Sequence, residues 1–317
     1  MCMESVSLFQ MEETAMSRLE CVAWKGLLLG LIVVSGSRRE CFAAEKSAPE
    51  LQWLTDYSQA MEQAKTERKT LLILFQRSDF NSVPDAYERQ YLPAQADLLQ
   101  SYVLVKIPTN GTISMGGKPL QLLSHAAFRE MHGSPGIAMV DLAHPKAAYY
   151  GYVVSVFPFQ RGKYYDFKPQ HLPVALSLPA GSLSQRSMVY AVRVHPERPG
   201  STTSGDLNPV LADEANKQSN YQAAINVQGH HNWDSRFGRI LSRLLSLGGR
   251  RPTEYPVEVV AESWPGQDLM DSCVDCVASW RQSPGHWSAV QARQASYGYD
   301  IRQGSNGIWY ATGIFAN

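Results

Sequence analysis

The sequence predicts two successive folds, a layered α/β domain and then an α+β domain that ends in an antiparallel hairpin. The first prediction rests on helices that alternate with apolar runs of strand length, the clearest being residues 71–75 and 102–107. Such an unbroken run fits a strand that is covered on both faces, as in an α/β layer sandwich. The second rests on a series of amphipathic helices followed by strands at residues 296–302 and 308–315, joined by the strong hairpin pair Asn306-Gly307.

Length and charge narrow the classes of function. The chain has 317 residues, which gives room for two domains. Lys and Arg number 29, as do Asp and Glu, so the formal net charge is zero. No long-range field therefore recruits nucleic acid or an anionic membrane, and we exclude both as partners. No apolar run approaches the roughly 18 to 20 residues that a membrane span requires, so no span is expected in the mature chain.

Residues 1–48 have the pattern of a leader. Basic residues precede the apolar run 26–34, and small residues come after it. This is the order of a signal peptide, with cleavage expected after Ser37 or near Ala43. We therefore expect an exported protein, either secreted, periplasmic or in the cell envelope. The alternatives are an uncleaved apolar anchor or a misassigned start, in which case residues 1–15 lie upstream of the true one.

The cysteines do not form a disulfide framework. The chain has 5 of them, and only Cys273 and Cys276 are certain to belong to the mature protein. On a helix these two share one face with Leu269 and Trp280, which predicts a buried stripe. A redox Cys-x-x-Cys needs the N-terminus of a helix after a strand, whereas this pair is predicted in mid-helix.

The first domain is expected at residues 49–180. Thr55 or Asp56 can cap an opening helix. The expected elements are a helix to 66, a strand at 71–75, a helical stretch punctuated by prolines to 100, a strand at 102–107, a helix at 122–131, strands at 136–142 and 149–154, and a short helix at 171–176.

This domain resembles the thioredoxin-like family. The stretch from Trp53 through Ala60 and Ala64-Lys65 to the strand 71–75 is similar to the opening helix and first central strand of that family. Gly133-Ser134-Pro135-Gly136 is similar to the segment that carries the family's cis-proline before a β-hairpin. In the family a Cys-x-x-Cys comes after the central strand, where the helix N-terminus lowers the thiol pKa. Residues 76–84 contain no cysteine, so we expect a module without redox activity, retained for packing or binding.

The second domain is expected at residues 181–317. Asn208 followed by a proline predicts a helix start, and Asp234 and Asp268 are further N-cap candidates. The expected elements are helices at 184–195, 208–227, 234–247 and 268–282, a polar loop at 196–206, a strand at 257–262, and the closing hairpin.

Three motifs of this domain resemble the CAP superfamily, in particular its bacterial SCP-like branch. Gly229-His230-His231-Asn232-Trp233 is similar to the segment after the family's long helix, and Ala261-Glu262-Ser263 to its second motif. Trp280-Arg281-Gln282-Ser283-Pro284-Gly285-His286 is similar to the bacterial W-x-x-S-P-G-H signature. The resemblance implies a CAP-type αβα sandwich after a thioredoxin-like layer sandwich.

The same resemblance implies a cleft in which His230, Glu262 and His286 converge and can hold a divalent cation. Imidazole and carboxylate ligands suit Zn²⁺. His231 is a competing candidate, because either neighbour could face the cleft. Animal members place a second glutamate where this chain has Ser283, so cation binding is expected to be weaker and one candidate general base is absent.

Two classes of function remain open. The leading hypothesis is a non-enzymatic binding or interaction protein, whose cleft recognises a small ligand, lipid, glycan or peptide. The alternative is a metal-dependent or His/Glu hydrolase that uses the same cleft. A thiol oxidoreductase is disfavoured by the cysteine-free segment 76–84. No catalytic residue or substrate is identified.

Overall fold

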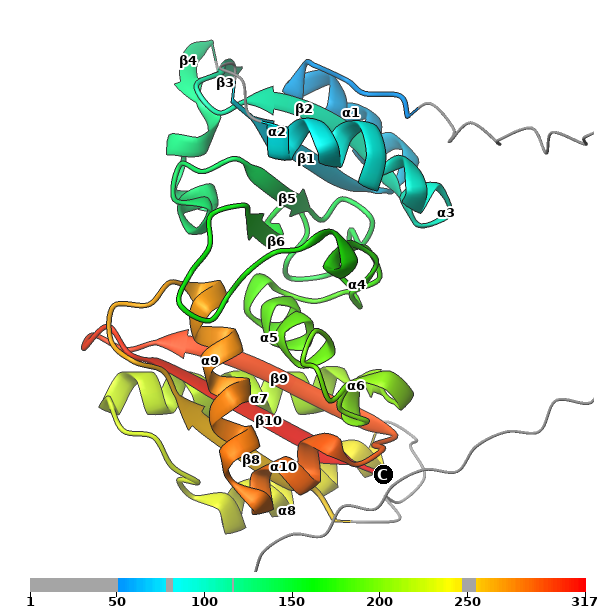
Figure 1. The fold of residues 1–317 in the computed structure, drawn as a ribbon. Coiled ribbons are helices and arrows are strands. Elements are labelled where there is room, and N and C mark those ends of the chain that lie inside the picture. The colour runs from blue at the N-terminus through cyan, green and yellow to red at the C-terminus, as the bar shows by residue number, and fades with distance from the viewer. Residues whose placement is uncertain (1–50, 78–81, 116, 247–254) are drawn as a thin grey trace, which may run out of the picture. The chain divides into compact units, whose positions relative to one another are not determined.

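A computed structural model describes residues 51–77, 82–115, 117–246 and 255–317 (Figure 1). These residues belong to one compact unit, which runs from Ser47 to Asn317. They form a mixed α/β protein with two four-stranded sheets. The expected leader, residues 1–48, and residues 78–81 of the cysteine-free segment lie outside the described residues. The expected domain boundary near residue 180 stays a prediction. None of the described helices has the length and apolar character needed to cross a membrane.

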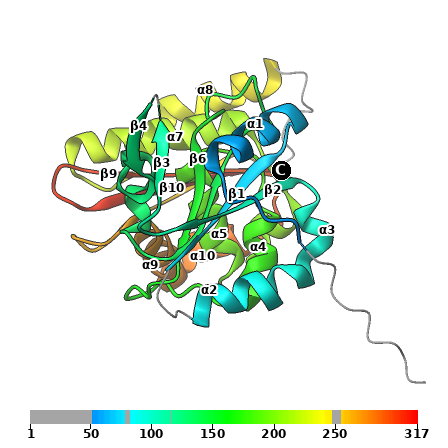
Figure 2. The same ribbon diagram turned by 90° about the horizontal axis from the view of Figure 1, so that it is seen from above.

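The first sheet contains the apolar strands of the N-terminal half, in the order β2-β1-β5-β6. It comprises β1 (Thr70–Gln76), β2 (Tyr102–Pro108), β5 (Gly136–Val140) and β6 (Val153–Pro158). β1 pairs in parallel with β2, whereas the β1–β5 and β5–β6 pairs are antiparallel. The five central residues of β1 are fully buried, which confirms the predicted central strand. Asp56 caps α1 (Tyr57–Glu67), which lies against β1 and β2 (Figure 2).

The segment between β1 and β2 is helical, as expected. Pro93 begins a new turn in it, whereas Pro84 lies within its first helix and divides nothing. The segment consists of α2 (Ser82–Ala86), a π-helical turn η1 (Tyr87–Tyr91), a 3-10 turn η2 (Pro93–Gln95) and α3 (Ala96–Leu99). A small hairpin of β3 (Thr112–Met115) and β4 (Lys118–Gln121) was not expected from the sequence. The half ends with η5 (Pro169–His171) and α4 (Leu172–Leu176), close to the predicted short helix.

Two predictions for this half were wrong. Residues 122–131 form the 3-10 turns η3 (Leu122–Ser124) and η4 (Ala126–Met131) instead of one helix. His125 between them has an extended backbone, and its Nδ1 accepts the N–H of Ala127 at 3.2 Å, which starts a new turn. The strand expected at 149–154 begins only at Val153, because residues 149–152 turn at Gly151, whose φ is 78°.

The second sheet has the order β7-β9-β10-β8. Its strands are β7 (Asp206–Leu207), β8 (Val257–Glu262), β9 (Ser296–Gln303) and β10 (Trp309–Ala316). The helices of this half are α5 (Leu183–Arg193), α6 (Ser201–Ser204), α7 (Pro209–Ile225), α8 (Trp233–Ser246), α9 (Leu269–Gln282) and α10 (Pro284–Gln291). The strand at 257–262, the closing hairpin, and the caps Asn208 of α7 and Asp268 of α9 are confirmed.

Three features of this half differ from expectation. Asp234, expected as an N-cap, lies inside the first turn of α8, which begins at Trp233. Residues 283–285 were expected only to end a helix. In the structure Pro284 is also the first residue of the next helix, α10. Proline is favoured at that position, since its missing N–H has no intrahelical partner there. The expected polar loop at 196–206 contains α6 and the start of β7.

α7 and α9 cover opposite faces of this sheet (Figure 1). Gly298 lies against the backbone of α7, where a Cβ would come within 2.2 Å of the Ala212 nitrogen. Its neighbour Tyr299 faces the other way, with its ring 5.9 Å from that of Trp280 on α9. Cys273 and Cys276 are unpaired and fully buried in this layer, which confirms that they belong to the core.

Candidate functional site

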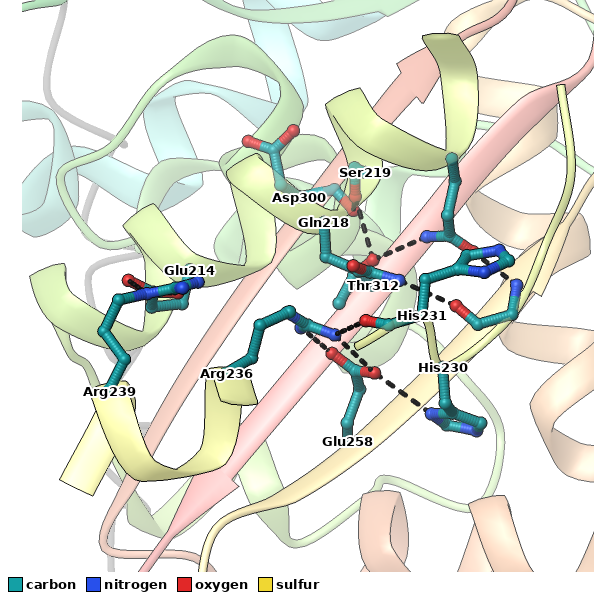
Figure 3. Close-up of polar contacts among 12 residues, drawn as sticks. Glu214, Gln218, Ser219, His230, His231, Arg236, Arg239, Glu258, Asp300 and Thr312 are labelled. Atoms are coloured by element: carbon teal, nitrogen blue, oxygen red, sulfur yellow. Dashed lines mark hydrogen bonds and ion pairs between the residues drawn. The ribbon is translucent and has the colours of Figure 1, made fainter. Parts of the chain in front are cut away.

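The loop after α7 carries His230, and two glutamines of the helix hold it. The helix ends before Asn226, whose φ of 53° is the left-handed conformation common at a helix C-terminus. Gln222 Oε1 accepts the N–H of Gly229 at 3.0 Å, and Gln218 Nε2 donates to the Gly229 carbonyl at 2.7 Å. Both polar backbone groups of Gly229 are therefore hydrogen-bonded, which fixes the backbone directly before His230. Gln218 and His230 are labelled in Figure 3.

Buried hydrogen bonds connect this loop to the sheet. Gln222 Nε2 donates to Thr312 Oγ1 at 3.0 Å, and Ser219 Oγ lies 3.1 Å from the same oxygen. Ser219 Oγ also donates to the Asp300 carbonyl at 3.0 Å. The side chains of Ser219, Gln222 and Thr312 are 0 % exposed. Since a buried polar group is costly without its partner, the network holds α7 and the loop in one position on the sheet.

His230 contacts a buried carboxylate on the edge strand β8. Its Nδ1 lies 3.0 Å from Glu258 Oε1. Glu258 is 6 % exposed and forms a two-pronged ion pair with Arg236 of α8, in which Nη1 donates to Oε1 at 3.1 Å and Nη2 donates to Oε2. Arg236 Nη1 also donates to the carbonyl of His231. The arginine thus holds both the carboxylate and the loop that bears His230 (Figure 3).

The contact with Glu258 determines the tautomer of His230. An ionised carboxylate can only accept hydrogen bonds, so the proton of a neutral imidazole must be on Nδ1. The lone pair is then on Nε2, which is the free metal-binding or proton-accepting atom of the ring. A carboxylate behind a histidine in this way is the usual arrangement that orients a metal ligand and raises its basicity.

His286 lies on the other side of that nitrogen, within hydrogen-bonding distance of it. It belongs to the first turn of α10, and its Nε2 is 3.4 Å from Nε2 of His230. The two ring centroids are 5.6 Å apart, and the His230 side chain is 44 % exposed. Burial and, second, the nearby His230 lower the pKa of His286. The two imidazoles therefore face each other at a point that solvent can reach.

The spacing of these nitrogens fits a shared cation. Two nitrogens bound to one tetrahedral zinc ion at about 2.0–2.1 Å lie about 3.4 Å apart. That is also the separation of the two Nε2 atoms. Among the residues that the structure describes, no three His, Cys, Asp or Glu side chains are grouped so that they could hold a metal ion. The described part thus offers two nitrogen ligands here, and other coordination positions would be left to water or to a ligand.

Glu262, the carboxylate expected in this site, lies farther along the same strand. It is the last residue of β8 and is exposed. Side chains four positions apart point to the same face of a strand but are about 13 Å apart along it. Within the described residues, no hydrogen bond or ion pair joins Glu262 to either histidine. The structure therefore brings His230 and His286 together, with Glu258 behind His230, and Glu262 as a metal ligand stays a prediction.

Of the two neighbouring histidines, His230 faces His286. His231 turns back toward the end of α7, and its Nε2 lies 3.2 Å from the carbonyl of Val227 in the loop after that helix. Its ring packs edge-on against that of Tyr221, with centroids 5.4 Å apart. These contacts leave His231 outside the pair.

Sequence reasoning missed Glu258 and Arg236. A signal was present, because Glu258 interrupts the apolar strand Val257–Glu262 and a carboxylate there is buried on one face. Buried carboxylates are rare without a partner. The partner could not be found in the same way, since α8 contains several arginines at positions of similar character.

Comparisons with known proteins leave the family open. No family model matches the chain, and no curated protein matches it. Among solved structures, an outer surface protein from Borrelia burgdorferi matches 36% of this chain and 78% of its own, with 15% identity and a TM-score of 0.28. The class defined by the fold is accordingly a mixed α/β protein with two four-stranded sheets.

Proposed function

We propose that the chain is an exported binding protein of the CAP type, whose His230 and His286 hold a divalent cation weakly in an open cleft. The observation that carries the proposal is the 3.4 Å separation of the two Nε2 atoms. The two residues are 56 positions apart and come from two of the three motifs that resemble the CAP superfamily. Their convergence supports that resemblance independently of the motifs.

Glu262 is the third contributor in this proposal, and it would act from the outer edge of the cleft. α10, which carries His286, packs against β8, the strand that ends at Glu262. A carboxylate there can attract a cation or hydrogen-bond its water ligands. The cation itself would supply a point of attachment for a ligand that carries an oxygen or nitrogen donor. We expect that ligand to be a small molecule, lipid, glycan or peptide.

Weak binding is expected from the number of ligands. Structural zinc sites use four protein ligands, and catalytic ones three, whereas this cleft offers two nitrogens and an outer carboxylate. Ser283 stands where animal members of the resembled family have another glutamate. A site so open contributes little to folding, and removal of the cation is expected to leave the fold intact.

A hydrolase is the alternative, and one observation favours it. Glu258 behind Nδ1 of His230 is the arrangement that makes an imidazole an oriented general base. Against it, Glu258 is already shared with Arg236, and the described contacts of the histidine pair include no hydroxyl or thiol nucleophile. Turnover of peptide or ester libraries that disappears in His286→Ala would favour the hydrolase.

The N-terminal half is part of the proposal as a thioredoxin-like module without redox chemistry. The antiparallel β5–β6 pair begins directly after Gly133-Ser134-Pro135, which supports the resemblance to the segment before the family's hairpin. The parallel pairing of β1 and β2 across a helical connection is consistent with it. The module would then contribute packing or a binding surface.

Calorimetric titration of the mature chain with Zn²⁺ tests the cation site. The variants are His230→Ala, His286→Ala and Glu262→Gln, with His231→Ala as the matched control. We expect wild type and the control to bind alike, Glu262→Gln to bind more weakly, and the other two to lose binding. Equal binding by all five proteins would overturn the proposal.

A further inference from the structure

A cavity lies apart from the histidine pair. It has a volume of about 770 Å³ and is lined by residues between 164 and 174, by the C-terminal end of α5 with the residues after it, and by the middle of α9. Neither His230 nor His286 lines it. Its volume is in the range of small-molecule sites, which is roughly 300–1,000 Å³. The question is therefore which chemical class of ligand its walls would accept.

Cationic side chains outnumber carboxylates in this lining. Lys168, Arg193 and Arg198 face a single lining carboxylate, Asp166, whose Oδ2 is 3.5 Å from Lys168 Nζ. Arg193 donates to two neutral acceptors, the Ser177 carbonyl at 2.9 Å and the Tyr297 hydroxyl at 3.5 Å. In the described part of the chain, no carboxylate pairs with Arg193 or Arg198. The cavity consequently carries an excess of positive charge that the described residues do not neutralise.

A histidine adds a neutral donor to this wall. Nδ1 of His195 accepts the backbone N–H of Glu197 at 3.2 Å, so the ring proton must be on Nε2. Burial lowers the pKa of His195, which favours this neutral form. The nearby carboxylate of Glu197 is occupied, since it accepts hydrogen bonds from Arg281 and from Trp287 Nε1. His195 therefore lines the cavity as a hydrogen-bond donor.

Most of the rest of the wall is apolar, although Gln170 and Thr203 also line it. Val194, Val274 and Val277 line it, together with Tyr190. The ring of Tyr190 is 4.9 Å from that of Phe157, and its hydroxyl lies 3.1 Å from Nδ1 of His171. Contacts at both ends of the tyrosine hold its ring in place, and because the ring is 1 % exposed it supports the wall from behind.

We propose that this cavity binds a small organic anion with an aromatic or aliphatic ring, whose charged group meets Arg193 and Arg198 and whose ring lies on the half-buried Val194 and Val274. Arginine provides planar, paired donors for carboxylate, sulfonate or phosphate oxygens. The apolar wall accounts for a ring in place of a free inorganic ion. This inference does not depend on cation binding at His230 and His286.

Three probes of one shape test the charge requirement. They are naphthalenesulfonate, naphthylmethanol and naphthylmethylammonium, each titrated into the mature chain by ligand-observed NMR. The sulfonate is expected to bind at least about tenfold more tightly than the alcohol, with the ammonium weakest, and its affinity should fall with added salt. Equal affinities for the three probes would overturn the proposal.

Variants test the location. Arg198→Glu changes an exposed residue and is expected to weaken sulfonate binding by about tenfold or more, as is Val274→Trp, which fills the cavity. Arg89→Glu, which makes the same charge change outside the cavity, is the matched control and should leave the affinity within about twofold. Melting curves of all variants identify any loss of fold. If Arg89→Glu weakens binding as much as Arg198→Glu, the affinity arises from general charge and the assigned cavity is wrong.

Discussion

Glu258 of β8 and Arg236 of α8 form a buried ion pair, and each is 6 % exposed. The same carboxylate contacts His230, and the same guanidinium holds the carbonyl of His231. A charge that loses its partner in such a position is strongly destabilising, because its desolvation is no longer offset. The pair therefore connects the stability of this half with the orientation of the candidate site.

Arg236→Met tests this connection. We expect it to lower the free energy of unfolding by about 3–5 kcal/mol, since Glu258 is left buried and unpaired. The double variant Arg236→Met, Glu258→Leu removes both charges and should recover much of that loss. Urea denaturation measures both values. A loss below about 1 kcal/mol in the single variant would show that the pair behaves as an exposed one.

The ion pairs of Glu214 are expected to make the stability of the fold depend on pH in the acid range. Burial would raise the pKa of this carboxyl, but hydrogen bonds from Arg239, Arg243 and Lys217 outweigh it and lower the pKa from 4.5 to about 2. A carboxylate with a depressed pKa stabilises the folded state above pH 4.5, and that contribution disappears as the pH falls toward 2. Glu214→Gln should therefore be less stable near neutral pH and lose less stability on acidification than the wild type.

The control for this prediction is Glu62→Gln, which changes an exposed carboxylate in an ion pair with Lys65. Thermal melting between neutral pH and pH 2 compares the three proteins. If the melting temperature of Glu214→Gln equals that of the wild type at every pH, the hydrogen bonds to Glu214 contribute nothing to folding.

Gln222→Ala tests how the His230 loop is positioned. The variant removes the acceptor of the Gly229 N–H and the donor to Thr312, both within the buried network. We expect a loss of about 1–3 kcal/mol in stability and several-fold weaker Zn²⁺ binding, although no cation ligand is changed. Asn220→Ala, on the exposed side of the same helix, should change neither quantity. Unaltered Zn²⁺ affinity in Gln222→Ala would mean that the loop is positioned without this network.

Because Cys273 and Cys276 are buried, we expect the mature chain to have no thiol redox activity. Burial raises the pKa of Cys273 and of Cys276 well above the ordinary value. The thiolate is the reactive form. In a chain that begins after Ala43 and so lacks Cys41, the native protein should not react with Ellman's reagent, and denaturant should expose both groups. The mature chain should also fail to accelerate insulin reduction by dithiothreitol. Fast labelling of the native protein would contradict the burial of the pair.

The sequence predicted the elements whose signals are local. The apolar strand β8 and the capped helix α9 are encoded by residues that lie next to one another. Local signals failed where two interpretations share the same residues, as at Pro284, which both ends one helix and begins the next. His125 broke a predicted helix because its side chain competes for the backbone N–H of Ala127, which periodicity does not register.

The candidate site was only partly predictable for a similar reason. Its histidines could be proposed from motifs, but the choice between His230 and His231 depends on the turn at Asn226 and on contacts with α7. The role of Glu258 depends on Arg236, which is 22 residues away and is brought to it only by the packing of α8 on the sheet. Such pairings arise from tertiary structure and leave no mark in the local sequence.

Long-range proton–nitrogen NMR of the imidazole rings tests the proposed cation site most directly. The mature chain is labelled with ¹⁵N and titrated with Zn²⁺, and the ring nitrogens are monitored individually. We predict that the Nε2 signals of His230 and His286 shift to metal-bound positions, while Nδ1 of His230 stays protonated against Glu258 and His231 does not change. If the Nε2 signals of both His230 and His286 remain where they were at saturating Zn²⁺, the cleft does not hold the cation and the proposed function is wrong.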